Sequence, residues 1–484
     1  MRITKAIFLL LFLNLLTSVH AQDLPYKYKI LQEMVLGNKY FMDKWPDPTA
    51  NIVTDKSRPS NLWTRGTYYE GLMALYRINK DTTYYKNAVT WGTFHNWGLT
   101  YGDNTSRIAD NQCCAQTYIE LYLLDKKIER IQPIKSCIDG MVNSAKADDW
   151  WWVDAFHMAM PVFAKLGAIY NDNQYFEKMY DLYNHAKTKP KINGLYNTTD
   201  HLWWRDSTFV APITTANGKQ VYWSRGNGWV LAALARVLDV MPENAPHRSE
   251  YIATFNEMAQ ALFAIQRPDG FWNSSLADPN DYGGMETSGT ALFTYALAWG
   301  INKGLLDTVT YMPVVVRAWT GMVNDALHSN GMLGYVQSSG KQPSDGQPLL
   351  YDKAANFEDF GLCAFLLAGS EVYKLAKDSA GYVIPTGIQN LPSTPNLSVS
   401  PNPFTIQTTI NYRLDKSCSV NLCIFDVTGK KICTILQNKT QMSGNYTYHW
   451  HGEDSFGNSV TAGIYIISIQ TGGMVQTRKV VLVR

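Results

Sequence analysis

Apolar residues recur with helical spacing from about residue 24 to about residue 380. Six stretches of this region are nearly all apolar after a polar or aromatic start, and six others keep one charged face. A helix that is apolar on every side is buried, whereas an amphipathic helix lies at the surface. The predicted buried helices begin at Trp63, Asp110, Trp152, Arg225, Glu286 and Asn356. The predicted outer helices cover residues 26–43, 83–95, 128–145, 174–187, 248–265 and 310–327.

Twelve helices that alternate between outside and inside predict a closed ring of six helical hairpins, an (α/α)6 toroid. The inner helices would stand parallel, so their N-termini would open on one end of the ring. Each polar residue there could instead cap only its own helix. Because six such residues occupy equivalent places, we favour a shared site. The residues are Arg65, Asp110, Asp154, Arg225, Glu286 and Asp359.

The pattern changes near residue 385, where proline, glycine and serine mark a linker over residues 385–397. Beyond it the apolar positions alternate, as in Val420–Ile424 and Gly463–Ile469. About seven short strands with regular turns predict a small β-sandwich over residues 398–484. The protein is therefore expected to be mainly α, with a helical domain over residues 22–384 and this sandwich behind it.

Residues 1–21 have the pattern of a secretory signal peptide. Arg2 and Lys5 precede an apolar run, and Val19–Ala21 is a small-x-small cleavage site. The apolar run is too short to cross a bilayer, which takes about 20 residues; an uncleaved anchor is the alternative. No later segment is long and apolar enough to span a membrane. We therefore expect an exported protein that does not span a membrane and ends outside the cell or at its surface.

Composition excludes one class of partner and predicts an aromatic interior. Charged residues make up 17% of the chain and the formal net charge is +2, so the basic excess typical of nucleic-acid-binding proteins is absent. Fourteen of the 15 tryptophans lie between Trp45 and Trp319. Most must pack in the core, and a few are expected to line a cavity.

Neither cysteines nor histidines predict a metal or cofactor. The seven cysteines form no Cys-x-x-Cys pair, and we expect them mainly as small buried hydrophobic residues. The nine histidines are scattered without the spacing of a metal site. The sequence therefore predicts chemistry by side chains alone.

Two aspartates at predicted inner helix starts are the candidate catalytic residues. Asp154 follows Trp150, Trp151 and Trp152, and a carboxylate among apolar rings loses hydration, which raises its pKa. Such a group suits a general acid. Asp110 could supply the second carboxylate that acid–base chemistry on a sugar commonly uses.

Further polar and aromatic residues are the candidate substrate-binding groups. Arg225 offers a planar fork for a carboxylate, and glycines on either side of Asn227 could let the backbone approach a ligand. Trp223 and Trp229 could present flat faces to sugar rings. His201 lies in a predicted loop and is either a site residue or an ordinary surface histidine. The predicted binding set is Arg225, Trp223, Trp229, Asn227, His201, Trp63, Trp152 and Glu286.

The helical region resembles glycoside hydrolase family 105, the unsaturated rhamnogalacturonyl hydrolases, which are related to the unsaturated glucuronyl hydrolases of family 88. The matching stretches spread over residues 60–375. They are Asp110–Gln112 with Gln116–Tyr118, Trp152–Ala155 through Pro161, Trp203–Asp206, Trp223–Trp229, Glu286–Thr290, and Phe360–Gly361 with Ala364–Ser370.

This resemblance implies removal of a 4,5-unsaturated uronic acid from the non-reducing end of a polysaccharide-lyase product. The C4=C5 double bond is hydrated, and the product then rearranges and releases the neighbouring sugar. By position, Asp154 matches the general acid/base and Asp110 the second carboxylate, while Arg225, Trp223 and Trp229 match substrate-binding positions. One departure is that many members place an active-site histidine shortly after a Gly-Leu-Tyr stretch. Here Gly194–Tyr196 is followed by Asn197, and the nearest histidine is His201.

The tail over residues 398–484 resembles the C-terminal sorting domain of the type IX secretion system. The matching stretches are Ser400–Phe404, Phe425–Lys430, Gly463–Tyr465 and Lys479–Arg484. The resemblance implies passage across an outer membrane by the type IX machinery, followed by release or surface attachment. The alternative is an ordinary sandwich module that binds carbohydrate.

Taken together, the residues and the resemblances predict an exported unsaturated-uronyl hydrolase. Its substrate would be an unsaturated oligosaccharide from pectin, rhamnogalacturonan or a related uronic-acid polysaccharide. The alternatives are another (α/α)6 enzyme, such as a polysaccharide lyase or a toroid glycosidase, and a non-catalytic glycan-binding surface protein.

Overall fold

The computed structural model describes residues 23–189, 194–378, 397–414, 417–427, 430–471 and 474–483. The chain divides into two compact units, Met1–Gly387 and Ile388–Arg484, and each is described by itself. The predicted signal peptide and residues 385–396 of the predicted linker lie outside the described residues.

Outer and inner helices alternate along the described part of the first unit. The outer helices are α1 (Lys27–Lys44), α3 (Thr82–Phe94), α6 (Gln132–Val142), α8 (Asn173–Thr188), α10 (Arg248–Ala264) and α12 (Thr308–Gly321). The inner helices are α2 (Trp63–Asn79), α4 (Ala109–Gln112) with α5 (Ala115–Asp125), α7 (Asp154–Tyr170), α9 (Ser224–Val240), α11 (Thr287–Asn302) and α13 (Asp359–Leu375). Short elements join them: β1 (Ile52–Val53), β2 (Ser57–Arg58), η1 (Thr100–Gly102), η2 (Ile128–Arg130), β3 (Tyr196–Asn197), β4 (Leu202–Trp203) and a π-helical turn, η3 (Met322–Ala326).

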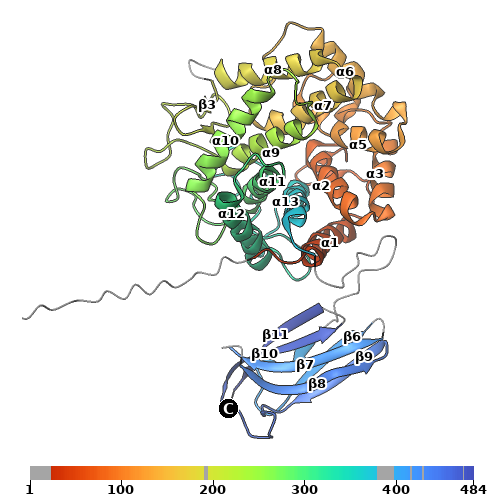
Figure 1. The fold of residues 1–484 in the computed structure, drawn as a ribbon, viewed down its shortest axis with the longest axis vertical. Coiled ribbons are helices and arrows are strands. Elements are labelled where there is room, and N and C mark those ends of the chain that lie inside the picture. The colour runs from red at the N-terminus through yellow and green to blue at the C-terminus, as the bar shows by residue number, and fades with distance from the viewer. Residues whose placement is uncertain are drawn as a thin grey trace, which may run out of the picture. The chain divides into compact units, whose positions relative to one another are not determined.

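The inner helices form a closed ring. Each packs against the next, in the order α2, α5, α7, α9, α11 and α13, and α13 packs back against α2. Figure 1 shows α2, α7, α9, α11 and α13 encircled by the outer helices. A buried ion pair between Arg65 of α2 and Asp359 of α13 joins the first and last hairpins. The predicted (α/α)6 toroid is confirmed.

The second inner helix differs from its prediction because it is broken. The helical hydrogen bonds lapse at Cys113 and Cys114, and Asp110 therefore lies on the separate short turn α4 rather than on α5. Helix α2 approaches closely here: a side chain at Gly66 would meet Cys114 backbone atoms at 3.2–3.3 Å. The break places Asp110 beside the start of α7, against which α4 packs.

Acidic residues cap several outer helices. Asp81, Asp172 and Asp307 accept backbone N–H bonds at the starts of α3, α8 and α12, which satisfies donors that the helix itself leaves open. Among the inner helices, Glu286 caps α11 in the same way. The simple capping interpretation therefore holds for Glu286, whereas Asp359 and Arg65 are paired with each other.

The second unit is a sandwich of two antiparallel sheets, as the alternating pattern predicts. One sheet has the order β11-β10-β7-β8 and the other β5-β6-β9. Alternate side chains of both sheets, among them Ile410, Leu422 and Ile467, share one apolar core. The strands are β5 (Ser398–Ser400), β6 (Thr408–Leu414), β7 (Cys418–Asp426), β8 (Lys431–Gln441), β9 (Gly444–Trp450), β10 (Gly463–Thr471) and β11 (Met474–Leu482).

The cysteines and the membrane prediction can be checked on the described residues. The four cysteines of the toroid are buried, as predicted, and the three of the sandwich are half-buried. No described helix combines the length and the apolar character that crossing a membrane requires.

Candidate active site

Asp154 is the first residue of α7, and the segment before it is fixed to a distant strand. The Val153 N–H donates to the Arg205 carbonyl oxygen at 2.9 Å, and Trp152 forms a β-bridge with Asp206. This pairing brings the Arg205 side chain onto Asp154, where Nε donates to Oδ2 at 3.1 Å. The Asp154 side chain is 12% exposed, so the carboxylate is nearly buried yet reachable.

Arg205 is the cation of the site. Its Nη1 donates to Asp206 Oδ2 at 2.8 Å, and its guanidinium lies 5.7 Å from the centre of the Trp151 ring. Burial acts to lower the pKa of Arg205, but the charges of Asp154 and Asp206 outweigh it and raise the pKa. Arg205 belongs to a stretch that resembles family 105. Its hydrogen bond to Asp154 could not be predicted, because the pairing of residues 152 and 206 that brings the two together leaves no local signal in the sequence.

Asp110, on the short helix α4 that packs against α7, is the second candidate carboxyl group. Burial and the neighbouring charge of Asp154 raise the pKa of Asp110 to about 7, against an opposing effect of Arg205. Within the described residues no hydrogen bond to this carboxyl group is found. The sequence predicts the proton-holding acid at Asp154, but the structure gives the surroundings of a neutral carboxylic acid to Asp110.

Two tryptophan rings beside inner-helix starts remain accessible. Trp151 is 57% exposed and lies on the buried Trp152, with ring centres 4.6 Å apart. Trp63 is half-buried and stacks on Phe360 at 5.8 Å. Trp63 therefore stays a candidate platform for sugar rings. Trp151 joins it in place of the predicted Trp152, whose side chain is covered.

Arg225 does not present the free fork that the sequence suggests. It is buried, with Nη1 donating to the Gln337 carbonyl oxygen at 2.7 Å and Nη2 to that of Ser338 at 2.8 Å. The Trp223 and Phe360 rings cover its two faces at 4.5 and 4.6 Å. Burial lowers its pKa to about 10 although acidic neighbours oppose this. In the structure Arg225 fastens the loop at residues 337–338 to the toroid.

Trp223 and Trp229 are buried, so neither offers a ring face to a sugar. Trp223 is 1% exposed and donates its ring N–H to Gln337 Oε1 at 2.7 Å, and Trp229 is fully buried. The neighbouring glycines serve packing: a side chain at Gly226 would meet Trp223, and one at Gly228 would meet Leu292, each at 2.9 Å. Neighbouring side chains therefore occupy the space in which the backbone was predicted to approach a ligand.

Asn227 and Glu286 have internal partners. Asn227 Oδ1 accepts the Trp203 N–H at 2.8 Å, and Nδ2 donates to the Trp203 carbonyl oxygen at 3.0 Å. Glu286 accepts the Ser288 and Gly289 N–H groups at 3.0 and 2.6 Å. Both side chains are buried. Asn227 thus secures the strand that leads to Arg205, and Glu286 begins α11.

His201 lies in the β3–β4 turn and is directed to an outer helix. Its Nδ1 is 3.3 Å from the Tyr196 hydroxyl and 3.6 Å from Glu257 Oε2 of α10. The structure shows no contact between His201 and either aspartate. Of the two interpretations left open by the sequence, its surroundings match the ordinary surface histidine.

A buried polar group lies one turn below the aspartates. His157 Nε2 is 2.9 Å from Glu70 Oε2, and Arg236 Nη2 is 3.4 Å from the same oxygen. Burial lowers the pKa of His157 despite the attraction of Glu70. These groups pair with one another across α2, α7 and α9, so they support the ring from within.

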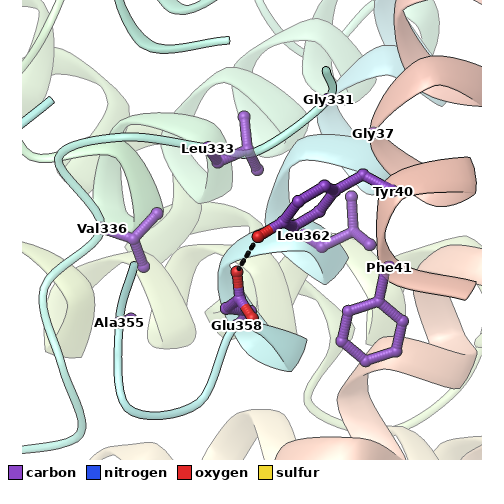
Figure 2. A pocket seen from close by; sticks show the side chains of 9 residues that line it. All are labelled: Gly37, Tyr40, Phe41, Gly331, Leu333, Val336, Ala355, Glu358 and Leu362. Atoms are coloured by element: carbon purple, nitrogen blue, oxygen red, sulfur yellow. Dashed lines mark hydrogen bonds between the residues drawn. The ribbon is translucent and has the colours of Figure 1, made fainter. Parts of the chain in front are cut away.

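A small cavity lies elsewhere, between α1 and the segment that leads into α13. Figure 2 shows Tyr40, Leu333 and Leu362 around it, with the Tyr40 hydroxyl donating to Glu358. Its volume of about 20 Å³ suits roughly one water molecule, so it cannot hold a sugar. Across the described chain no three His, Cys, Asp or Glu side chains gather as a metal site would require.

The fold and the paired carboxyl groups define a carbohydrate-active toroid enzyme, and comparisons give its family. The model of Glycosyl Hydrolase Family 88 matches residues 34–376, and the FlgD Ig-like domain model matches residues 402–473. The protein belongs to glycosyl hydrolase family 88 and is a glycosidase. The sequence resemblance named family 105, with family 88 as a related family. The family model shows that the chain belongs to family 88.

Two relatives carry names of hydrolases of this kind, and a third is named as a lyase. The unsaturated 3S-rhamnoglycuronyl hydrolase of Formosa agariphila is 36% identical over 65% of this chain and 84% of its own length. A family 88 structure from Bacteroides vulgatus is 32% identical, covers 72% of this chain and 99% of its own, and has a TM-score of 0.66. A structure named as a polysaccharide lyase has the same identity, coverage of 72% and 98%, and the same TM-score.

Family 105 is represented among the similar folds. A family 105 glycoside hydrolase from C. acetobutylicum is 20% identical, covers 71% of this chain and 99% of its own, and has a TM-score of 0.56. At this identity the likeness shows a shared toroid fold.

Proposed function

We propose that the protein removes a 4,5-unsaturated uronic acid from the non-reducing end of polysaccharide-lyase products by hydrating the C4=C5 double bond. One observation carries the proposal: Asp110 and Asp154 come together at the starts of α4 and α7 and interact electrostatically. Hydration needs one proton delivered to C4 and another taken from the water that attacks C5. Two carboxyl groups in different protonation states can do both.

An anionic sugar must be recognised by positive side chains at the site itself, because the net charge of the whole chain is only +2. Arg205 is a cation that binds Asp154 directly, and 17% of its side chain is exposed. It stands beside the accessible ring of Trp151. We assign to Arg205 and Trp151 the binding that the sequence assigned to Arg225, Trp223 and Trp229.

The proposed substrate class is an unsaturated uronyl residue linked to rhamnose. The name of the relative from Formosa agariphila favours a 3-sulfated rhamnose, whereas the family 105 resemblance favours the rhamnogalacturonan linkage. Matched unsaturated disaccharides with and without the sulfate, together with rhamnogalacturonan-lyase products, separate the two. We expect the highest kcat/KM on the sulfated sugar; an equal or higher value on the unsulfated sugars would favour the rhamnogalacturonan linkage.

A lyase is the second candidate, because a similar structure carries that name. The alkene chromophore distinguishes the two reactions: a lyase creates it in intact polymer, and a hydrolase consumes it in lyase products. We expect intact polymer to give no rise in alkene absorbance. A rise would reverse the assignment.

We further propose that the protein is exported and that residues 398–484 act as a type IX sorting domain. The motifs of the tail and its Ig-like sandwich support this. The test is expression in a bacterium that has the type IX machinery, with the whole chain or a chain ending at Gly387. The whole chain should reach the surface or medium and the shorter one should stay in the periplasm; equal export of both would disprove a sorting role.

A further inference from the structure

We infer that Tyr101 and Ile108 extend the sugar-binding surface that begins at Trp151, and that these side chains hold the sugars beyond the bond that is broken. The enzyme then acts preferentially on oligosaccharides longer than a disaccharide. This inference rests on the proposed function, because it concerns the part of the substrate that the proposed reaction releases.

The three residues lie on segments that lead from an outer helix into an inner helix. Tyr101 and Ile108 lie between α3 and α4, and Trp151 lies between α6 and α7. Because each inner helix begins where such a segment ends, these segments lie on the face of the ring where the inner helices open. Asp110 and Asp154 stand at the starts of α4 and α7 on that face. The three apolar side chains therefore share a face with the two aspartates.

Exposure to solvent separates these side chains from the aspartates. Tyr101 is 64% exposed and Ile108 is 54% exposed, much like Trp151, whereas the Asp154 side chain is largely covered. An enzyme that acts at a chain end encloses the terminal residue and leaves the rest of the chain directed to solvent. The terminal uronyl residue thus belongs beside Asp154, and the exposed side chains stand where the remaining sugars emerge.

The order of the sugars along this surface follows from Arg205. Its guanidinium lies over the Trp151 ring and also binds Asp154, so Trp151 takes the sugar next to the broken bond. Tyr101 and Ile108 take the sugars that follow. The flat faces of a sugar ring carry C–H groups, which pack on aromatic or branched aliphatic side chains while the hydroxyl groups stay in water.

An ion pair fastens the two segments to each other. Arg107 Nε donates to Asp149 Oδ1 at 2.9 Å, and Arg107 Nη2 pairs with the other oxygen of the same carboxylate. A two-point contact of this kind fixes orientation as well as distance. Arg107 directly precedes Ile108, and Asp149 lies two residues before Trp151. The pair therefore holds both segments in place while the Ile108 and Trp151 side chains stay available to a ligand.

Tyr101 is presented by a backbone in an unfavourable conformation. Its φ of 63° lies in the left-handed region, which is uncommon for residues other than glycine. Neighbouring contacts fix the turn: Thr100 Oγ1 donates to the Asn61 carbonyl oxygen at 2.6 Å, and Asn104 Oδ1 accepts the Leu99 N–H at 2.9 Å. The turn, η1, packs against α4. Strained residues that are fixed by their surroundings cluster at ligand-binding sites, and here the strained residue carries the exposed ring.

The test compares kcat/KM of the whole chain on an unsaturated disaccharide and an unsaturated tetrasaccharide from the same lyase digest, measured by loss of alkene absorbance. Wild type should favour the tetrasaccharide by about tenfold, mainly through KM. Tyr101→Ala and Ile108→Ala should each lower this ratio about threefold, and the double variant should bring it close to one. Because both substrates are measured on one preparation, the ratio does not depend on the folded fraction.

Two residues at the other ends of the inner helices supply matched controls. Leu124 is 50% exposed near the end of α5, and Tyr170 is 37% exposed as the last residue of α7. The 17 residues of α7 span about 25 Å, so Tyr170 is far from the end that carries Asp154. Leu124→Ala and Tyr170→Ala remove similar side chains and should keep the wild-type ratio.

Equal kcat/KM of wild type on the two lengths, or a wild-type ratio in the double variant, would overturn this inference and leave the proposed function intact. A double variant that keeps the ratio but changes the sedimentation of the protein would show that these residues contact a second copy of the chain instead. A wild type that consumes neither substrate would overturn the proposed function, and the inference with it.

Discussion

Asp110 and Asp154 begin neighbouring inner helices, yet only Asp154 is bonded to an arginine. Asp110 is half-buried without a hydrogen-bond partner among the described residues, and its raised pKa follows from that burial and from the charge of Asp154. A pair of carboxyl groups in unlike surroundings can hold one proton between them near neutral pH. This asymmetry is the chemical basis of the site.

The raised pKa of Asp110 predicts a pH-dependent cost to stability. The folded protein binds this proton up to about pH 7, whereas the unfolded chain releases it near 3.8. Folding is therefore increasingly penalised as pH rises from about 4 to 7, and the penalty is constant above that range. Asp110→Asn removes the penalty, so its melting temperature relative to wild type should increase across this interval and then level off. Thermal unfolding at a series of pH values checks it; a difference independent of pH would contradict the assigned burial.

Truncation of two tryptophans should have different effects: one should weaken substrate binding and the other should lower the stability of the fold. Trp151 is exposed, so Trp151→Ala should change the free energy of unfolding by less than about 1 kcal/mol. It should raise KM roughly fivefold if its ring supports a sugar. Trp229 is fully buried, so Trp229→Ala should cost about 3–5 kcal/mol. Denaturant unfolding and steady-state kinetics measure both; an unchanged KM in Trp151→Ala would remove that residue from the binding site.

At the residue scale the sequence places the two aspartates at inner helix starts, but it does not predict that Arg205 pairs with Asp154. Their places at inner helix starts follow from the apolar pattern, which fixes where each helix begins. The neighbours of Arg225 do not follow from it, since the carbonyl group that binds its Nη1 lies 112 residues away. Contacts of this kind depend on the path of a loop, and the spacing of apolar residues does not encode that path.

At the scale of elements, the site depends on how one short strand is held. Asn227 of α9 binds both the N–H and the carbonyl group of Trp203 in β4. Arg205 follows two residues later, and the bridge between residues 152 and 206 completes the attachment to α7. A single amide on α9 therefore helps to orient the arginine that faces Asp154.

Asn227→Ala should uncouple this strand. It leaves two buried backbone groups of Trp203 unpaired, which costs about 2–4 kcal/mol, and it should lower kcat because Arg205 loses its alignment. Asn38→Ala is a matched control: Asn38 is equally buried and accepts a hydrogen bond from Tyr68, so its loss leaves the attachment of Trp203 intact. Unfolding and kinetics should show a stability loss in both variants and a kcat loss only in Asn227→Ala. A similar kcat in the two variants would contradict the positioning role.

The apolar pattern predicted the helices because most residues of the long inner helices are buried, although Leu123 and Leu124 of α5 are exposed. It did not predict the break between α4 and α5, because the apolar run continues through Cys113 and Cys114. The break arises where α2 comes close at Gly66. Such a contact between helices is decided by the assembled ring and not by the segment.

At the scale of the whole molecule, the chain has two units with separate cores. The toroid closes through contacts between α13 and α2, so residues near both ends of the first unit are needed for one ring. Alternation of apolar residues predicted the sandwich, and helical spacing predicted the toroid, because each pattern reports a periodic exposure to solvent. The role in export that we propose for the second unit is not encoded in that periodicity.

The two-unit organisation predicts that the toroid functions without the sandwich. All proposed site residues lie in the first unit, so a chain ending at Gly387 should keep the wild-type kcat and KM. Calorimetry should show the loss of one unfolding transition and an unchanged melting temperature for the other. A truncated chain that folds but has lost activity would show that the sandwich contributes to the site.

The most direct test of the account follows the alkene absorbance of lyase-generated uronyl oligosaccharides with wild type and Asp154→Asn, after circular dichroism has shown that the variant is folded. We predict a steady loss of absorbance with wild type, release of a saturated oligosaccharide one residue shorter, and no loss with Asp154→Asn. No loss with wild type on any such substrate, or near-normal turnover by Asp154→Asn, would contradict the account.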